Sequence, residues 1–332
     1  MNRENRPTGA PFIHCASTVP VRMLDALAAT LPAFVWGCYV YGLRAFVIVA
    51  IAVASAIATE LIFTLVTRRR GNHGVHDLSS CVTGVITGLL LPVTVPLYYP
   101  VAAAVAGVFF GKLIYGGLGH NVFNPAAVGI GLMTVAFPET MTRFVQPYTK
   151  LPAFDIRISP ELLDGLLAES PLSSLKRVEI DVSSVAEKFY GFVCGGIGTI
   201  SALMLLLGLI YLLFRRTVTP HATVAYLGTI VFCAALFGYS KSLEEPFAYA
   251  FAQLLSGNAV FAGVFLINDS VTTPMTRNGK IFFGAVCGLL TMIMRLYCAE
   301  PDGAVLSVLL VNAFVPLFEK MTMQPVFGRY YK

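Results

Sequence analysis

Residues 84–96 read GVITGLLLPVTVP, and residues 263–274 read GVFLINDSVTTP. Both stretches begin with Gly-Val and end with Val-Thr-x-Pro, and they align with a single gap. Glycine and proline interrupt both apolar runs. In membrane proteins, interrupted apolar segments at matching positions of two halves point to a binding site between broken helices. The two stretches therefore predict a chain built from two related halves.

The composition around these stretches is that of an integral membrane protein. The chain has 332 residues, of which 56% are hydrophobic and 12% charged, and its mean hydropathy is +0.74. A soluble protein carries about a quarter of its residues as charges, so this chain cannot cover a soluble surface of its size. Its net charge of +5 therefore indicates basic loops beside anionic lipid, and no nucleic-acid partner is expected.

Ten apolar segments approach the roughly 20 residues that a membrane-spanning helix needs. The predicted spans are residues 24–42, 45–66, 79–96, 100–116, 124–138, 189–214, 219–238, 246–267, 281–297 and 304–318. Five spans precede one long polar loop and five follow it, so the second half is inverted relative to the first. We therefore expect an all-α polytopic membrane protein with two inverted five-helix repeats and broken helices.

The basic residues predict the orientation, because cytoplasmic loops carry an excess of lysine and arginine. The segments on one side contain Arg3, Arg6, Arg22, Arg68, Arg69, Arg70, Arg215, Arg216, Arg277, Lys280, Lys320, Arg329 and Lys332. The short loops on the other side contain only Arg44 and Lys241. Both termini are therefore predicted to lie in the cytoplasm, and the long loop outside.

These patterns divide the chain into five regions. The predicted regions are a cytoplasmic tail (1–23), a first transmembrane repeat (24–138), an extracytoplasmic loop (139–188), a second repeat (189–318) and a second cytoplasmic tail (319–332).

No motif of a soluble enzyme is present, and no catalytic residue is predicted. The seven cysteines form no C-x-x-C pair, and the five histidines are dispersed. The residues therefore predict no metal site within this chain, although clusters shared with another subunit stay open.

Polar residues in the apolar segments are the candidate sites. In GGLGHNVFNPA (116–126), Asn121 and Asn124 precede Pro125, which interrupts a helix. This segment is either a tight turn or a broken-helix ion site.

Three further polar residues are candidates. Asp269 and Thr272 follow the eighth span, and Glu60 lies within the second. Intramembrane carboxylates point to ion pathways. The alternative is that Asp269 is solvated near the interface and that Glu60 pairs with an interfacial arginine.

Together these segments resemble the D subunit of the Rnf ion-translocating electron-transport complex and its relative, the B subunit of the sodium-translocating NADH:quinone reductase. The matching segments, in order along nearly the whole chain, are Ala58–Leu61, Thr83-Gly84, Leu89–Pro92, Gly111-Lys112 running into GGLGHNVFNPA, Asp269–Pro274, Gly279-Lys280 and Asn312–Leu317. GGLGHNVFNPA is the most specific of them.

The resemblance implies a fold similar to that of urea transporters and an FMN joined through its phosphate to a threonine hydroxyl in the outer loop. A flavin transferase reads a motif like Asp-x-x-[Ser/Thr]-[Gly/Ala]-Ala-Thr-Pro-Leu. On this sequence Asp164, Ser170 and Pro171 match it, with serine in place of the attachment threonine. Leu167 and Glu169 depart from it.

Three further points concern the flavin and the ion. Ser173 and Ser174 are alternative attachment residues, and Lys176 and Arg177 are candidates to favour a reduced, anionic flavin. Thr199 stands where the family usually has glutamate, which argues against an ion site there. Thr83, Gly84, Asn121 and Asn124 are further candidate cofactor-binding residues, and a noncovalent flavin is an additional possibility.

The function implied is that of a flavin-carrying membrane subunit. In a complex with the A, B, C, E and G subunits in the inner cell membrane, it couples electron transfer between ferredoxin and NAD to translocation of Na⁺ or H⁺. The alternative is a stand-alone secondary transporter or channel, which inverted repeats support equally well.

Overall fold

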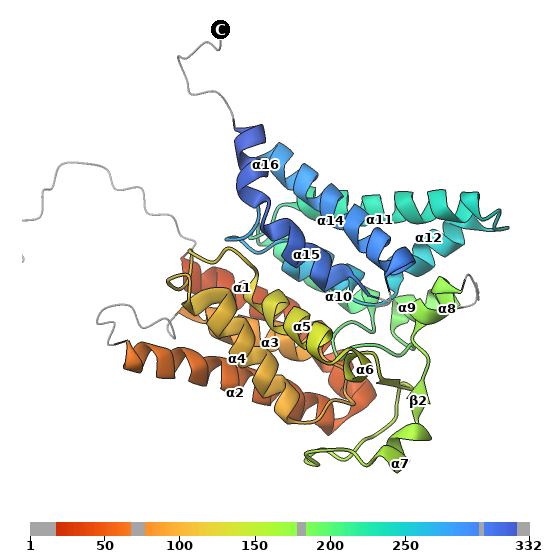
Figure 1. Ribbon diagram of the computed structural model, residues 1–332, viewed down its shortest axis with the longest axis horizontal. Helices are drawn as coiled ribbons and strands as arrows, with labels where there is room; N and C mark the ends of the chain where they lie inside the picture. The colour runs from red at the N-terminus through yellow and green to blue at the C-terminus, as the bar shows by residue number, and fades with distance from the viewer. Residues whose placement is uncertain (1–17, 68–76, 178–183, 299–301, 324–332) are drawn as a thin grey trace, which may run out of the picture.

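The computed structural model describes residues 18–67, 77–177, 184–298 and 302–323. This part of the chain is mostly helical, as predicted, and its helices form two groups that lie side by side (Figure 1). Several basic residues used above to predict the orientation lie outside the described residues: Arg3, Arg6, Arg68, Arg69, Arg70, Arg329 and Lys332.

The first group contains five helical segments, coloured red to yellow in Figure 1. They are α1 (Val19–Tyr41), α2 (Leu43–Val66), α3 (Ser79–Leu90), α4 (Tyr98–Val108) continued by the π-helix η2 (Phe109–Leu113), and α5 (Pro125–Ala136). Helix α2 packs against α3 and α4, and α4 packs against α5.

The second group repeats this order of contacts. Its elements are α10 (Ala202–Phe214), α11 (Pro220–Ser240), α12 (Pro246–Leu255), α13 (Ala259–Phe261) continued by the π-helix η3 (Ala262–Leu266), α14 (Arg277–Tyr297), α15 (Ala304–Asn312) and α16 (Val315–Thr322). Helix α11 packs against α12 and α14, and α14 packs against α15. The two groups meet where α10 lies against α1 and where α15 lies against α5.

The two matched stretches occupy corresponding places in these groups. A Cβ on Gly84 in α3 would lie 2.6 Å from the Cα of Val53 in α2. A Cβ on Gly263 in η3 would lie 3.1 Å from side-chain atoms of Tyr226 and Leu227 in α11. Each glycine therefore lets a broken segment approach the second helix of its own group, α2 or α11, which explains why both stretches contain glycine there.

The helix lengths confirm a multi-pass membrane protein. Within the described ranges, four helices are long and apolar enough to cross a membrane: α1, α2, α11 and α14. Two bent pairs, α12 with α13–η3 (65°) and α15 with α16 (60°), raise this number to six. Shorter apolar helices, α3, α4–η2, α5 and α10, stand at the other four predicted spans, so the count of ten stays a prediction.

Proline explains why some of these helices are short. Helix α3 ends at Leu90, and the chain continues without helix past Pro92 and Pro96. Proline has no N–H to donate and disfavours helical geometry in the residue before it. The sixth predicted span is interrupted without a proline: α9 ends at Tyr190, and helix resumes at Ala202 after an irregular, glycine-rich segment.

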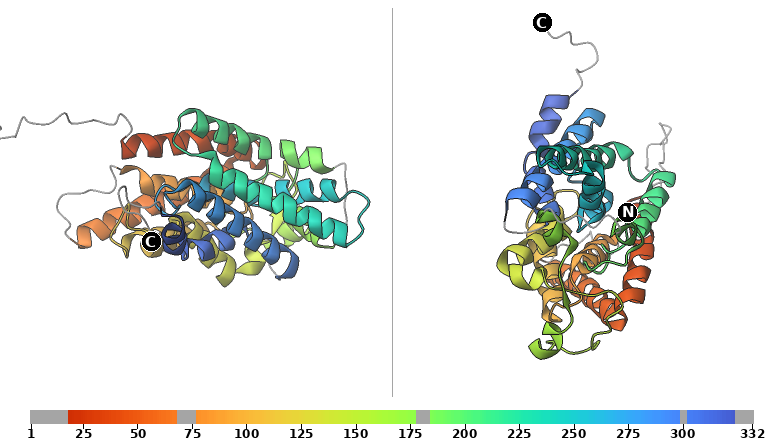
Figure 2. Two further views of the ribbon diagram at one scale, coloured as in Figure 1. Left: turned by 90° about the horizontal axis from the view of Figure 1, so that it is seen from above. Right: turned by 90° about the vertical axis from the view of Figure 1, so that its right-hand side faces the viewer.

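Short elements join the two groups at one end of the bundle, which we call the loop face (right in Figure 1). They are α6 (Pro138–Met141), β1 (Phe144–Val145), α7 (Pro160–Asp164), β2 (Leu167–Ala168), α8 (Pro171–Lys176) and α9 (Ser184–Tyr190). β1 and β2 pair antiparallel, with Phe144 opposite Ala168. The left view in Figure 2 also shows the green segments of this region toward one end.

The opposite end, which we call the basic face, carries Arg22, Arg215, Arg277 and Lys280 at the start of α1, the end of α10 and the start of α14. The guanidinium Nε of Arg215 lies 3.0 Å from Oδ1 of Asp25, which ties α10 to α1 at this face.

Candidate functional site

A cavity of about 120 Å³ opens between the two helix groups near the basic face. It is lined by residues from α1, α3, η2, α5 and the turn after η3. The predicted residues Thr83, Asn121, Asn124 and Asp269 all line it, although they come from both halves of the sequence. We call it the basic-face cavity. Gly84 does not line it, because Gly84 faces α2.

Asn124 joins the two halves at this cavity. Its Oδ1 accepts hydrogen bonds from the backbone N–H groups of Ala126 (3.0 Å) and Ala127 (3.2 Å), which caps α5. Its Nδ2 donates to the carbonyl oxygen of Leu266 at the end of η3, at 3.4 Å. One side chain therefore joins two helix ends from opposite halves of the molecule.

Asn121 also faces the basic-face cavity, but its bonding differs. Its side chain is 7% exposed, and its Oδ1 has no hydrogen-bond partner among the described residues. A buried acceptor without a partner is costly, so this oxygen is available to a ligand in the cavity.

Asp269 and Thr272 form a local turn beside the cavity. Thr272 Oγ1 donates to Asp269 Oδ2 at 3.0 Å. None of the ion pairs found among the described residues involves Asp269. Its neighbour Asn268 donates from Nδ2 to Thr223 Oγ1 (2.7 Å) and to the carbonyl oxygen of Gly263 (3.0 Å), which fixes the turn after η3. Asn268 was not predicted as a site residue.

Glu60 is buried in α2, and its partner is a lysine. Its Oε1 lies 2.5 Å from Nζ of Lys112 in η2, and the two side chains are 3% and 2% exposed. The ammonium of Lys112 also donates to Ser79 Oγ (2.6 Å) and Ser80 Oγ (3.3 Å). The Ser80 hydroxyl donates to Glu60 Oε2. We call Glu60, Lys112, Ser79 and Ser80 the lysine cage.

The lysine cage borders the basic-face cavity. Lys112 and Ser79 line the cavity, whereas Glu60 does not. Lys112 lies on a π-helical turn, a feature frequent at functional sites. The sequence signal that would have found it is a lysine inside the apolar run 100–116, since intramembrane ionisable residues are functional candidates by default.

A second cavity, of about 60 Å³, lies at the loop face and contains the predicted attachment residue. Ser170, Pro171, Thr199, Asn258 and Asp302 are among its lining residues. We call it the loop-face cavity.

Ser170 itself is 9% exposed and forms the N-cap of α8. Its Oγ accepts from the backbone N–H of Ser173 (3.3 Å) and lies 2.7 Å from Ser173 Oγ. The Glu169 carboxylate turns away to pair with Arg177 at 2.9 Å. Asp164 is exposed at the end of α7, outside the cavity. Lys176 donates to the carbonyl oxygen of Cys298.

These residues fit one part of an FMN better than the other. A serine hydroxyl that lines a cavity can carry a phosphoester. The cavity, however, is far smaller than the about 300 Å³ or more of ordinary ligand pockets. A cavity of this volume would not hold the isoalloxazine ring of a flavin attached at Ser170.

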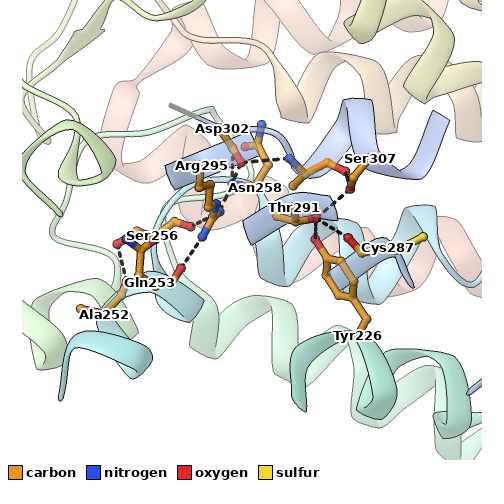
Figure 3. Close-up of polar contacts among 11 residues, drawn as sticks. Tyr226, Ala252, Gln253, Ser256, Asn258, Cys287, Thr291, Arg295, Asp302 and Ser307 are labelled. Carbon is orange, nitrogen blue, oxygen red and sulfur yellow. Dashed lines mark hydrogen bonds and ion pairs between the residues drawn. The ribbon is translucent and has the colours of Figure 1, made fainter. Parts of the chain in front are cut away.

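Asp302 lines the loop-face cavity on the side of the second half, and its carboxylate pairs with Arg295, which lies outside the cavity lining. Figure 3 shows the contacts of this pair. Arg295 Nη1 donates to the carbonyl oxygen of Gln253 (2.5 Å), and Nη2 donates to that of Ser256 (2.9 Å) and to Asp302 Oδ1 (3.2 Å). Asp302 Oδ2 accepts from the backbone N–H of Asn258 at 2.6 Å. The guanidinium thus binds the carbonyls that the break between α12 and α13 leaves free.

The hydroxyl groups of Tyr226, Thr291 and Ser307 form a short chain next to this network, with spacings of 3.3 and 2.7 Å (Figure 3).

Arg44 plays the corresponding role in the first half. It was expected to be a loop charge, but it is fully buried. Its guanidinium donates to the carbonyl oxygens of Val93 and Val95, both at 2.9 Å, in the irregular segment after α3. It also donates to the carbonyl oxygens of Pro152 and Asp155. Arg44 is therefore a structural clamp on a broken helix.

Comparison with known proteins gives one consistent result. The model of the family described as NQR2, RnfD, RnfE matches residues 7–328. The D subunit of the Na⁺-translocating ferredoxin:NAD⁺ oxidoreductase complex of Acetobacterium woodii is 32% identical over 324 residues, which are 97% of this chain and 94% of that protein.

Two proteins named as the D subunit of an ion-translocating oxidoreductase complex are similar over comparable lengths. The protein of Cronobacter sakazakii is 29% identical over 97% of this chain and 99% of its own length. The protein of Actinobacillus pleuropneumoniae is 32% identical over 96% of this chain and 97% of its own length.

Proposed function

This chain belongs to the NQR2, RnfD, RnfE family, and from that membership we propose that it is the D subunit of an ion-translocating oxidoreductase complex. The observation that carries this proposal is the full-length similarity to proteins named as that subunit. The complex transfers electrons between ferredoxin and NAD and moves a cation across the inner cell membrane. The chain works with the other membrane and peripheral components, the A, B, C, E and G subunits, and is not catalytic alone.

The proposed topology has ten spans in two inverted repeats, similar to urea transporters, with both termini in the cytoplasm. The matching order of helix contacts in the two groups supports the repeat. The position of Gly84 against α2 and of Gly263 against α11 supports it as well. The gathering of Arg22, Arg215 and Arg277 at one end of the bundle supports a cytoplasmic basic face.

The proposed redox group is an FMN joined through its phosphate to Ser170. When bound, the flavin supplies one-electron transfer, and the chain's part is to hold it at the loop face. The hydroxyl-bearing residue Ser170 lines the loop-face cavity, and Asp164 is exposed where a flavin transferase can read it. The proline after Ser170 starts α8 and fixes the direction of the chain at the attachment point.

The basic-face cavity is proposed as the cation entrance. Its volume of about 120 Å³ holds several waters but is below that of ordinary ligand pockets. We therefore assign Thr83, Asn121 and Asn124 to the cation pathway in preference to a noncovalent flavin. Glu60, Asp269 and Thr272 supply the oxygen atoms that a partly dehydrated cation needs.

Mass spectrometry of the native protein tests the flavin. The peptide that contains Ser170 is expected to carry the added mass of FMN, and Ser170→Ala is expected to lack it while the subunit still assembles. Ser173→Ala, which removes the neighbouring hydroxyl, is the matched control and is expected to keep the flavin. Unmodified Ser170 in the fully assembled complex would refute covalent attachment and leave family membership intact.

The subunit role has a separate test. Deletion of this chain is expected to abolish NAD⁺ reduction by reduced ferredoxin in membranes, and the tagged chain is expected to copurify with the other subunits. Cation transport by the purified chain alone, without redox partners, would favour the stand-alone transporter instead.

A further inference from the structure

We propose that Lys112 is a tethered cation that occupies the place of the transported cation, and that the two exchange at Glu60. In the structure the Lys112 ammonium lies beside Glu60, Ser79 and Ser80. For a cation to bind, the lysine side chain swings into the basic-face cavity and the incoming ion takes over its oxygen ligands. The inference rests on the proposed ion-translocating function.

The ligands of the ammonium are those of a cation site. Lys112 Nζ lies 2.5 Å from Glu60 Oε1, 2.6 Å from Ser79 Oγ and 3.3 Å from Ser80 Oγ. These ligands are one carboxylate and two hydroxyls, which are hard oxygen ligands. Such ligands suit a small metal cation that binds oxygen in preference to nitrogen. All of these contacts are to side chains, which can adjust to an ion of a different radius.

The order of the groups makes Lys112 the barrier. Lys112 and Ser79 line the cavity, whereas Glu60 and Ser80 do not. An ion in the cavity therefore meets the ammonium and the Ser79 hydroxyl before it meets the carboxylate. As long as Lys112 stays in place, like charge repels the ion and the cage has no free ligand.

The cavity can receive the displaced ammonium. The Oδ1 of Asn121, in the cavity wall, is buried and has no hydrogen-bond partner in the described part of the chain. Asp269 adds a carboxyl group to the same wall, and of the described residues Arg22 adds a second positive charge beside Lys112. The exchange keeps the charge of the cage constant, because one monovalent cation leaves Glu60 as another arrives.

Chemical labelling of the native complex tests this exchange without any variant and without electron transfer. Reductive methylation of lysines is measured by peptide mass spectrometry in sodium chloride and in choline chloride at equal ionic strength. Sodium is expected to increase methylation of Lys112 about tenfold, the change expected when a minor conformer becomes the main one. Lys280, bonded to Thr219 at the basic face, is the control and should not respond.

Equal methylation of Lys112 in the two salts would overturn the proposal. A change of Lys112 methylation with lowered pH that differs from that of Lys280, with no response to sodium, would also overturn it, and would assign the cage to protons.

A variant gives the second readout. In Lys112→Met, dicyclohexylcarbodiimide is expected to label Glu60 faster than in the native protein, and sodium is expected to suppress that labelling. Labelling that sodium leaves unchanged would contradict exchange at Glu60. Neither readout uses the flavin or ferredoxin. A failure of the exchange at Glu60 can therefore be told apart from a failure of the proposed electron-transfer function.

Discussion

Lys112 and Arg295 are both buried near the end of a helical segment, one in each half of the molecule, yet their surroundings differ. Within the described residues, the ligands of the Lys112 ammonium all belong to side chains. Arg295 binds two backbone carbonyl oxygens and one carboxylate, and that carboxylate is itself held by the backbone N–H of Asn258. Lys112 lines a cavity in which Asn121 Oδ1 has no hydrogen-bond partner among the described residues. Arg295 instead binds the carbonyls at the break between α12 and α13.

The difference separates an exchangeable charge from a fixed one. Lysine is a compact point charge on a flexible stem, and the oxygen ligands of Lys112 can accept another ion. Arginine presents a rigid fork that matches fixed acceptors and is always charged. Lys112 is therefore expected to be the moving part of the first half, and Arg295 a structural brace of the second.

The largest expected effect comes from Arg295→Met. It leaves two buried carbonyls and Asp302 without their partner, and breaking a buried ion pair costs about 3–5 kcal/mol. The midpoint temperature of thermal unfolding in detergent should fall steeply, and no added cation should restore it. Arg277→Met, at an exposed position on the same helix, is the control. A midpoint near that of the control would show that Arg295 is no brace.

Lys112→Met should destabilise the protein by a similar amount, about 3–5 kcal/mol, in sodium-free medium. In this variant sodium should restore part of the loss, because an ion that binds only the folded state stabilises it by about 2–3 kcal/mol at a hundredfold excess over its dissociation constant. The check is the same unfolding midpoint, measured in sodium and in choline salts. An equal midpoint in the two salts would show that Lys112, like Arg295, is a fixed structural charge.

A double variant sharpens the same point. Glu60→Gln with Lys112→Met removes both charges, and replacing both partners of a buried pair is close to neutral, so the cost should fall to about 1 kcal/mol. Stability returns, but sodium dependence of both stability and activity should be lost. Sodium-dependent activity that persists in the double variant would place the cation elsewhere.

The smallest expected effect is that of Asn124→Ala, beside the cavity that Lys112 faces. Loss of the α5 cap should cost about 1 kcal/mol, together with the bond to Leu266 that joins the halves. Ion-coupled electron transfer should fall more than stability does. Asn124→Ser keeps a capping oxygen and is the control; equal coupling in the alanine and serine variants would assign Asn124 to capping alone.

Much of this site was predictable from local sequence. Proline and glycine mark the breaks, and the polar residues Thr83, Asn121, Asn124 and Asp269 stand out in apolar segments. The structure brings these four residues together at one cavity. The proximity of these four residues depends on how the two halves pack. The matched stretches 84–96 and 263–274 already indicated two halves with broken helices.

The buried ion pairs were harder to predict. Pairing of Glu60 with Lys112 requires α2 and η2 to lie together, and the two residues are 52 positions apart. Arg44 stands between two apolar segments, where a charged residue is expected in a loop. Only the folded chain shows that it donates to four backbone carbonyls. Ser170 matched a motif by position, but its burial as a helix cap depends on the packing of the loop face.

Sodium uptake driven by electron transfer tests the central claim most directly. Inverted membrane vesicles that contain the native complex are supplied with reduced ferredoxin and NAD⁺, and accumulation of radioactive sodium is measured against the Glu60→Gln variant. The native vesicles should accumulate sodium, and the variant should reduce NAD⁺ with little or no accumulation. Equal accumulation in the two would contradict a cation site at Glu60 and, with it, the role of Lys112 as the cation that exchanges there.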